Sequence, residues 1–121
     1  MACASFALGL PGFGSYCELL RRDPHSELGE LASAISTNVT AFFRVVHHYD
    51  LLANELLPRW LHERRRDGDR LRIWSAGCST GEEPYALAMV LAEAIEQSGS
   101  RLDAKIRATD LSPQARETAR K

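Results

Sequence analysis

The stretch Leu71–Tyr85 reads LRIWSAGCSTGEEPY and predicts a strand, a glycine-bracketed turn and a helix, in that order. Leu71–Trp74 has the apolar, β-branched and aromatic character of a buried strand. Gly77 and Gly81 bracket the turn, where glycine lets the backbone bend sharply and approach a bound molecule. Glu82–Pro84 suits a first helical turn, because carboxylates favour the positive end of the helix dipole and proline needs no N–H partner there. Such a turn before a helix N-terminus can accept an anionic or polar ligand.

The rest of the C-terminal half continues the alternation of strand and helix. Apolar residues recur at the spacing of one helix face over 85–97, and Gly99 is expected to end that helix. A second strand is expected over Ile106–Asp110. Ser112 is expected to cap a last helix that begins at Pro113 and continues to the end of the chain. This β-α-β-α order predicts a parallel sheet with a right-handed crossover.

A sheet of two parallel strands is incomplete, because parallel strands are normally buried between helix layers and exposed edges are unfavourable. We therefore expect an α/β fold in which a small N-terminal helical subdomain precedes the first β-α-β-α of a doubly wound, Rossmann-like domain. The predicted division is an irregular N-terminus over 1–12, a helical subdomain and linker over 13–68, and the start of the larger domain over 69–121. On this view the chain is a fragment of low stability.

Helical spacing dominates the N-terminal half. Two short helices are expected between Ser15 and Ile35, with Asp23 or Ser26 near the cap of the second. The next residues, 36–44, suit a loop that ends in a short helical turn with two phenylalanines, Phe42 and Phe43, anchored in the core. An amphipathic helix over 49–61 is expected to bend or break at Pro58, and an arginine-rich segment with a glycine, 64–69, to end it.

Composition excludes several classes of protein. The chain has 121 residues, of which 45% are hydrophobic and 26% charged, and its net charge of -1 argues against a protein built mainly to bind nucleic acid or membrane. No run is long enough to span a bilayer, and the N-terminus is a poor signal peptide. The three cysteines form neither a CxxC pair nor a zinc-binding spacing. We expect a cytoplasmic protein without a metal.

The residues alone leave four interpretations of the glycine turn open. The first is an ordinary α/β turn without a ligand. The second is a nucleophile elbow, since Gly77–Gly81 matches G-x-S-x-G, but all four histidines precede Ser79 where the fold needs one after it. A Cys78 nucleophile assisted by His47 or His48 remains possible under that interpretation.

The third and fourth interpretations concern nucleotides and nucleosides. A phosphate loop would need a lysine after Gly81, where the chain has Glu82. A nucleoside that lacks phosphates and carries a positive charge suits the acidic residues better, and S-adenosylmethionine is such a molecule. Asp110, at the end of the second strand, is placed to bind both ribose hydroxyls, and the carboxyl ends of parallel strands would gather Gly77, Glu83 and Asp110 around one crevice.

Four segments of the chain together resemble one family, the CheR-type chemotaxis receptor methyltransferases. The segments are TNVTAFFR over 37–44, HHY over 47–49, WSAGCSTGEEPY over 74–85 and ATD over 108–110. The resemblance implies a methyltransferase of the S-adenosylmethionine-dependent type, which converts glutamate side chains of chemoreceptors to methyl esters and releases S-adenosylhomocysteine. It covers the chain from about Phe13 onward.

The resemblance also implies roles for individual residues. Asn38, Thr40 and Arg44 match the cofactor-contacting loop between the two parts of the family's fold, and the arginine is implicated near the reacting centre as well. Glu83 matches the acid that contacts the amino-acid end of the cofactor, and Asp110 the ribose-binding acid. Structural alternatives exist for each: Thr40 as a helix cap, Arg44 in a surface ion pair, and Glu83 as a favourable first-turn residue.

The expected partner is the acidic methylation region of the cytoplasmic helices of a chemoreceptor, and we expect a monomer. His47 and His48 are expected to support helix packing. The alternative to an enzyme is a non-catalytic cofactor- or receptor-binding module that uses a basic stretch. Its members are the arginines Arg59, Arg64, Arg65, Arg66, Arg70 and Arg72.

Overall fold

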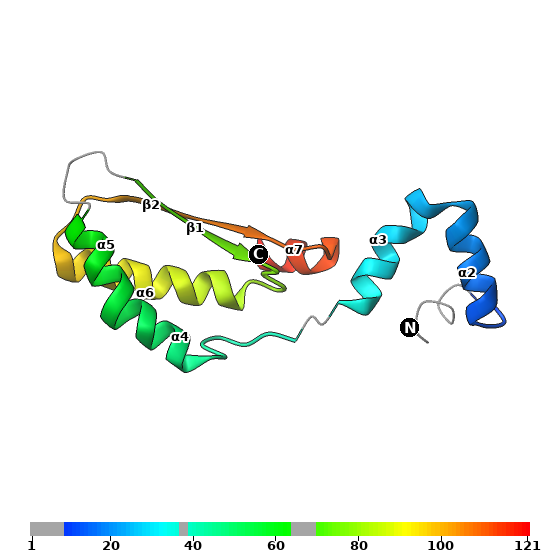
Figure 1. Ribbon diagram of the computed structural model, residues 1–121, viewed down its shortest axis with the longest axis horizontal. Helices are drawn as coiled ribbons and strands as arrows, with labels where there is room; N and C mark the ends of the chain where they lie inside the picture. The colour runs from blue at the N-terminus through cyan, green and yellow to red at the C-terminus, as the bar shows by residue number, and fades with distance from the viewer. Residues whose placement is uncertain (1–8, 37–38, 64–69) are drawn as a thin grey trace.

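The computed structural model describes residues 9–36, 39–63 and 70–121 of the chain, and its elements alternate between helix and strand in the C-terminal half (Figure 1). In chain order the elements are α2 (Phe13–Arg22), α3 (Pro24–Ile35), α4 (Val46–Leu51), the π-helical segment η1 (Leu52–Leu56), α5 (Leu57–Glu63), β1 (Arg70–Ala76), α6 (Glu82–Ser98), β2 (Asp103–Thr109) and α7 (Pro113–Ala119). The predicted α/β class is confirmed.

The strands β1 and β2 form a two-stranded parallel sheet, paired from Arg70 with Asp103 to Ala76 with Thr109. The predicted β-α-β-α order is therefore confirmed, although β2 begins earlier than expected. The helix between the strands ends where it was predicted to end, at Gly99, whose φ of 62° is the left-handed conformation that glycine adopts at helix C-termini.

The hydrophobic core lies between the sheet and the helices on one of its faces. Leu71 is buried on the inner face of β1 and packs with residues of η1, α5 and α6. Figure 1 shows α4, α5 and α6 on the same side of the two strands. Side chains alternate along a strand, so Arg72 and Trp74 lie on the opposite face, and the Trp74 side chain is 68% exposed. No helix of the described ranges covers that face.

The helices α2 and α3 extend away from the sheet in Figure 1. Asp23 caps α3 as predicted, because its carboxylate accepts the backbone N–H of Ser26 at 3.2 Å. One hydrogen bond joins α3 to the C-terminal part of the chain: the hydroxyl of Ser33 lies 3.3 Å from that of Ser112, the N-cap of α7. The beginning of α7 is thus in contact with α3.

Three predictions about these elements need correction, two in whole and one in part. Phe42 and Phe43 lie in a turn before α4, are 52% and 38% exposed and do not join the core, and the Phe43 ring packs on Tyr49 instead. Of the predicted bend or break at Pro58, the break does not occur: α5 continues through the proline, and the wider π turn of η1 lies just before it, where a proline removes an N–H donor and displaces the carbonyl one turn back. The helix α7 ends at Ala119 and does not continue to the last residue, Lys121. The predicted end of the preceding helix within 64–69 lies outside the described residues.

Candidate functional site

The glycine turn after β1 is tied to the end of β2. The backbone N–H groups of Gly77 and Cys78 both donate to the carbonyl of Thr109, at 2.8 and 2.9 Å. Gly77 and Gly81 have φ angles of 85° and 105°, and Ser79 also has a positive φ, 48°. The turn therefore needs left-handed backbone at three positions, two of which glycine occupies without strain.

Asp110 links the two strand ends through both of its carboxylate oxygens. Its Oδ2 accepts the backbone N–H of Ser79 at 2.7 Å, and its Oδ1 accepts the N–H of Ser112 at 2.8 Å. A carboxylate offers about four acceptor positions, so these two bonds leave lone pairs for a ligand. Asp110 is half-buried at the carboxyl end of the sheet, which is where open α/β sheets bind ligands.

The two glutamates at the start of α6 have different partners. Glu83 Oε1 accepts a hydrogen bond of 2.6 Å from the hydroxyl of Ser75, which is buried on the inner face of β1. Glu82 instead accepts one from Thr80, also at 2.6 Å. A residue of the sheet, Ser75, therefore orients the carboxylate of Glu83, whereas a residue of the glycine turn, Thr80, orients that of Glu82.

A cavity of about 510 Å³ lies between the segment before α4 and the glycine turn. Within it the structure brings together three of the residues selected from the sequence, Thr40, Arg44 and Glu83, with Gly77. Arg44 Nη1 donates to the carbonyl of Val39 at 2.6 Å, which holds the guanidinium next to its own loop. The other lining residues are Val39, Ala41, Val45, His48, Tyr49, Ser79 and Leu87.

The other two residues predicted for the site are Asp110 and Asn38, and neither is among the described residues that line this cavity. Asp110 does not line this cavity, but it is joined to it through Ser79. Asn38 lies outside the described residues. The cavity thus connects the loop before α4 with the turn after β1, two segments that are about 35 residues apart in the sequence.

Sequence reasoning missed two polar residues of this region. Ser75 was identifiable from the alternation along β1, since it shares the inward face with Leu71 and Ile73. Tyr49 lines the cavity, and its ring packs on Phe43 with centroids 5.0 Å apart in an edge-to-face arrangement. Burial, followed by the neighbouring Glu83 carboxylate, raises the pKa of the Tyr49 hydroxyl above its ordinary value.

The environment of Cys78 argues against a cysteine nucleophile. Its side chain is buried, and burial followed by the nearby Asp110 raises the pKa of the thiol, so less thiolate forms at neutral pH. A reactive cysteine needs the opposite shift. No cluster of three or more metal-binding side chains occurs within 9–36, 39–63 and 70–121.

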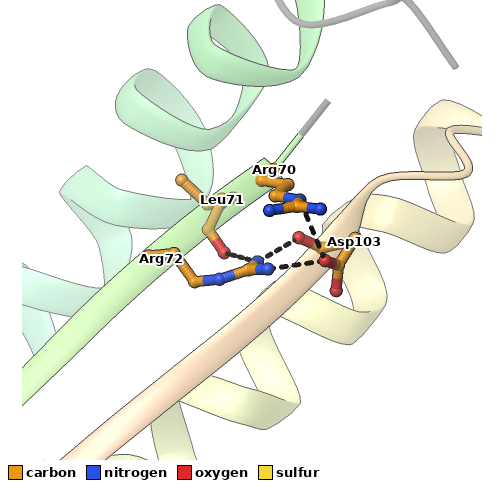
Figure 2. Close-up of polar contacts among 4 residues, drawn as sticks. All are labelled: Arg70, Leu71, Arg72 and Asp103. Carbon is orange, nitrogen blue, oxygen red and sulfur yellow. Dashed lines mark hydrogen bonds and ion pairs between the residues drawn. The ribbon is translucent and has the colours of Figure 1, made fainter. Parts of the chain in front are cut away.

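The basic stretch is largely engaged in ion pairs where the structure describes it. Figure 2 shows Arg72 reaching across the sheet to the carbonyl and carboxylate of Asp103, with Arg70 beside them. Arg59 pairs with Glu63 one helical turn later, at 3.0 Å. The other members, 64–66, lie outside the described residues. In the same ranges, no helix is long and apolar enough to cross a membrane.

Comparison with protein families identifies the domain that carries this cavity. Residues 38–121 match the model of the CheR methyltransferase, SAM binding domain, which is more than half of the chain. The chain belongs to the CheR methyltransferase family. The cofactor of this CheR domain is S-adenosylmethionine. The match includes Thr40 and Arg44 of the loop as well as Glu83 and Asp110.

Curated relatives agree with this assignment. The CheR chain is 44% identical over 115 residues to the chemotaxis protein methyltransferase of Escherichia coli K12, covering 94% of the chain and 37% of that protein. It is 43% identical to that of Salmonella typhimurium, with 94% and 36% covered, and 44% identical to that of Borreliella burgdorferi, with 86% and 38% covered. The chain thus spans little more than a third of the length of these relatives.

Proposed function

We propose that this chain carries part of the site of an S-adenosylmethionine-dependent enzyme that methylates glutamate side chains of chemotaxis receptors. The products would be glutamate methyl esters and S-adenosylhomocysteine. The observation that carries the proposal is the cavity, which combines the loop residues Thr40 and Arg44 with the glycine turn and Glu83. The family match and the names of the relatives support it.

Two acids would bind the two ends of the cofactor. Glu83, which is oriented by Ser75 and exposed to the cavity, would pair with the ammonium group of the amino-acid end. Asp110 would accept the ribose hydroxyls with the lone pairs that its two backbone hydrogen bonds leave unused. Asn38, Thr40 and Arg44 would contact the cofactor from the loop before α4.

Arg44 would position the methyl acceptor. S-adenosylmethionine supplies a sulfonium methyl group that a receptor carboxylate can take by in-line displacement. A glutamate is already ionised at neutral pH, so the chain needs no strong general base. A guanidinium in the cavity can orient the carboxylate by two parallel hydrogen bonds, so the contribution of Arg44 would be orientation.

The domain division, oligomeric state, location and partner of the protein are proposed on the same basis. Residues 13–68 would form the helical subdomain and linker, and 69–121 the beginning of the cofactor domain, in a protein that acts as a monomer in the cytoplasm. Its partner would be the acidic methylation region of the receptor's cytoplasmic helices. The alternative, a non-catalytic module that binds through the basic stretch, is less favoured because Arg59 and Arg72 already form ion pairs.

Calorimetric titration of the chain with S-adenosylhomocysteine tests the cofactor site. We expect binding, and we expect Glu83→Gln to weaken it about tenfold or more, since a hydrogen bond to a charged group contributes about 1.5–3 kcal/mol. Glu82→Gln is the matched control, because the neighbouring carboxylate is bound by Thr80 and does not line the cavity. Absence of S-adenosylhomocysteine binding to a folded chain would favour the alternative, a non-catalytic module that binds through the basic stretch.

Transfer of a labelled methyl group to receptor-containing membranes tests the reaction. Release of the label as methanol in alkali would identify an ester. We expect Arg44→Ala to reduce the rate of transfer even when S-adenosylmethionine is saturating. An unchanged rate in that variant would exclude the positioning role.

A further inference from the structure

Tyr49 is a polar residue of the cavity that the roles above leave unused. It lies in α4 and lines the cavity together with Glu83 and Gly77. Among the residues that the structure describes, no hydrogen bond to its hydroxyl occurs, although the side chain is half-buried. The Tyr49 hydroxyl is therefore available to donate a hydrogen bond to a molecule bound in this cavity.

The position of the Tyr49 ring is fixed by Phe43. The two rings meet edge to face, with centroids 5.0 Å apart and an interplanar angle of 67°. Phe43 has a φ of 53°, a left-handed conformation that is rare for a bulky residue. This backbone geometry belongs to the same loop that carries Thr40 and Arg44, so the loop and the Tyr49 ring are positioned together.

The position of Glu83 indicates which group of a ligand a donor at Tyr49 could bind. If Glu83 pairs with the ammonium of an amino-acid group, the carboxylate on the same carbon must lie close to it. A carboxylate so near Glu83 is repelled by it and needs a donor directed at it. Tyr49 lines the same cavity as Glu83, and a tyrosine hydroxyl is protonated at neutral pH and can donate. Burial, followed by the Glu83 carboxylate, raises its pKa further.

We propose that the Tyr49 hydroxyl donates a hydrogen bond to the carboxylate at the amino-acid end of S-adenosylmethionine, beside the ammonium bound by Glu83. The inference rests on the proposed function of this cavity and adds a second recognition contact to it. It does not depend on Arg44, whose guanidinium is held next to its own loop by the carbonyl of Val39.

The test compares two ligands and two variants of the full chain by calorimetry. S-adenosylhomocysteine carries the carboxylate, and its decarboxylated form keeps the ammonium but lacks the carboxylate. We expect Tyr49→Phe to weaken binding of S-adenosylhomocysteine about tenfold and to leave binding of the decarboxylated form unchanged. The phenylalanine keeps the ring that packs on Phe43, so the variant removes only the hydroxyl.

Tyr85→Phe is the matched control. Its hydroxyl donates to the carbonyl of Ala119 at 2.9 Å and does not line the cavity, so we expect unchanged affinity for both ligands. Equal weakening of both ligands by Tyr49→Phe, or no weakening of either, would overturn the inference while leaving the proposed function intact. Absence of S-adenosylhomocysteine binding to the unchanged chain would overturn both.

Discussion

The carboxylate of Asp110 accepts the backbone N–H of Ser79 at 2.7 Å, so the acid that follows β2 holds the turn that follows β1. Its other oxygen accepts the N–H of Ser112, the N-cap of α7. One side chain therefore joins the glycine turn, the end of β2 and the start of α7. Asp110, the proposed ribose acid, therefore has a structural role in this chain.

Replacing Asp110 with asparagine is expected to lower the stability of the fold. An amide has one acceptor oxygen where the carboxylate has two, so one of the two backbone N–H groups would face an NH₂ group. We expect a loss of about 2 kcal/mol in the free energy of unfolding, measured by urea denaturation. Asp50→Asn, on the exposed surface of α4, should leave the urea midpoint unchanged. Equal midpoints for Asp110→Asn and the unchanged chain would show that these hydrogen bonds contribute little.

Gly81→Ala is expected to destabilise the chain by about 1–3 kcal/mol. The φ of Gly81 is 105°, and an added Cβ would lie 3.1 Å from the Cβ of Ala119 and from the ring of Tyr85. Gly29→Ala provides the contrast, because that position lies inside α3 with no atom within 4 Å, and it should gain about 0.5–1 kcal/mol. Thermal denaturation of the two variants should shift in opposite directions. A shift in the same direction would contradict the backbone argument.

Alkylation should distinguish the cysteines by their surroundings. Burial and Asp110 raise the pKa of the Cys78 thiol, so its reaction with iodoacetamide should be slow at neutral pH and accelerate only above the pH at which an ordinary thiol ionises. Cys17 is only half-buried and should react before Cys78. Mass spectrometry of the labelled peptides measures both rates, with urea-unfolded protein as the reference. Rapid labelling of Cys78 in the folded chain would contradict this and support Cys78 as a nucleophile.

The ion pair between Arg72 and Asp103 should make stability depend on pH (Figure 2). The hydrogen bond from Arg72 lowers the pKa of the Asp103 carboxyl in the folded chain. A lowered folded-state pKa means that this contribution is present above the unfolded-state value and is lost as the pH falls through the folded-state value. The stability difference between the unchanged chain and Asp103→Asn should therefore be seen at neutral pH and disappear in acid. Salt should reduce it, because both side chains are partly exposed. If the stability difference between the two proteins persisted in acid, it would have a cause other than this ion pair.

The local elements follow from the sequence because each depends on neighbouring residues. The cap at Asp23, the glycine stop at Gly99 and the Ser112–Pro113 start of α7 are short-range features, and the structure confirms all three. The burial of Phe42 and Phe43 was predicted wrongly, because apolar character alone does not tell whether a segment reaches the core.

The sequence by itself determined the order of elements and the glycine turn, because spacing and local motifs encode these, and its resemblance to one family selected Asn38, Thr40, Arg44, Glu83 and Asp110 as candidate residues. Only the tertiary structure decided which of them share a cavity, since that depends on how the loop before α4 folds back onto the turn after β1. It also decided that Asp110 holds the turn, that Ser75 orients Glu83 and that Tyr49 faces the same cavity. These relationships join residues far apart in the chain, which no local pattern specifies.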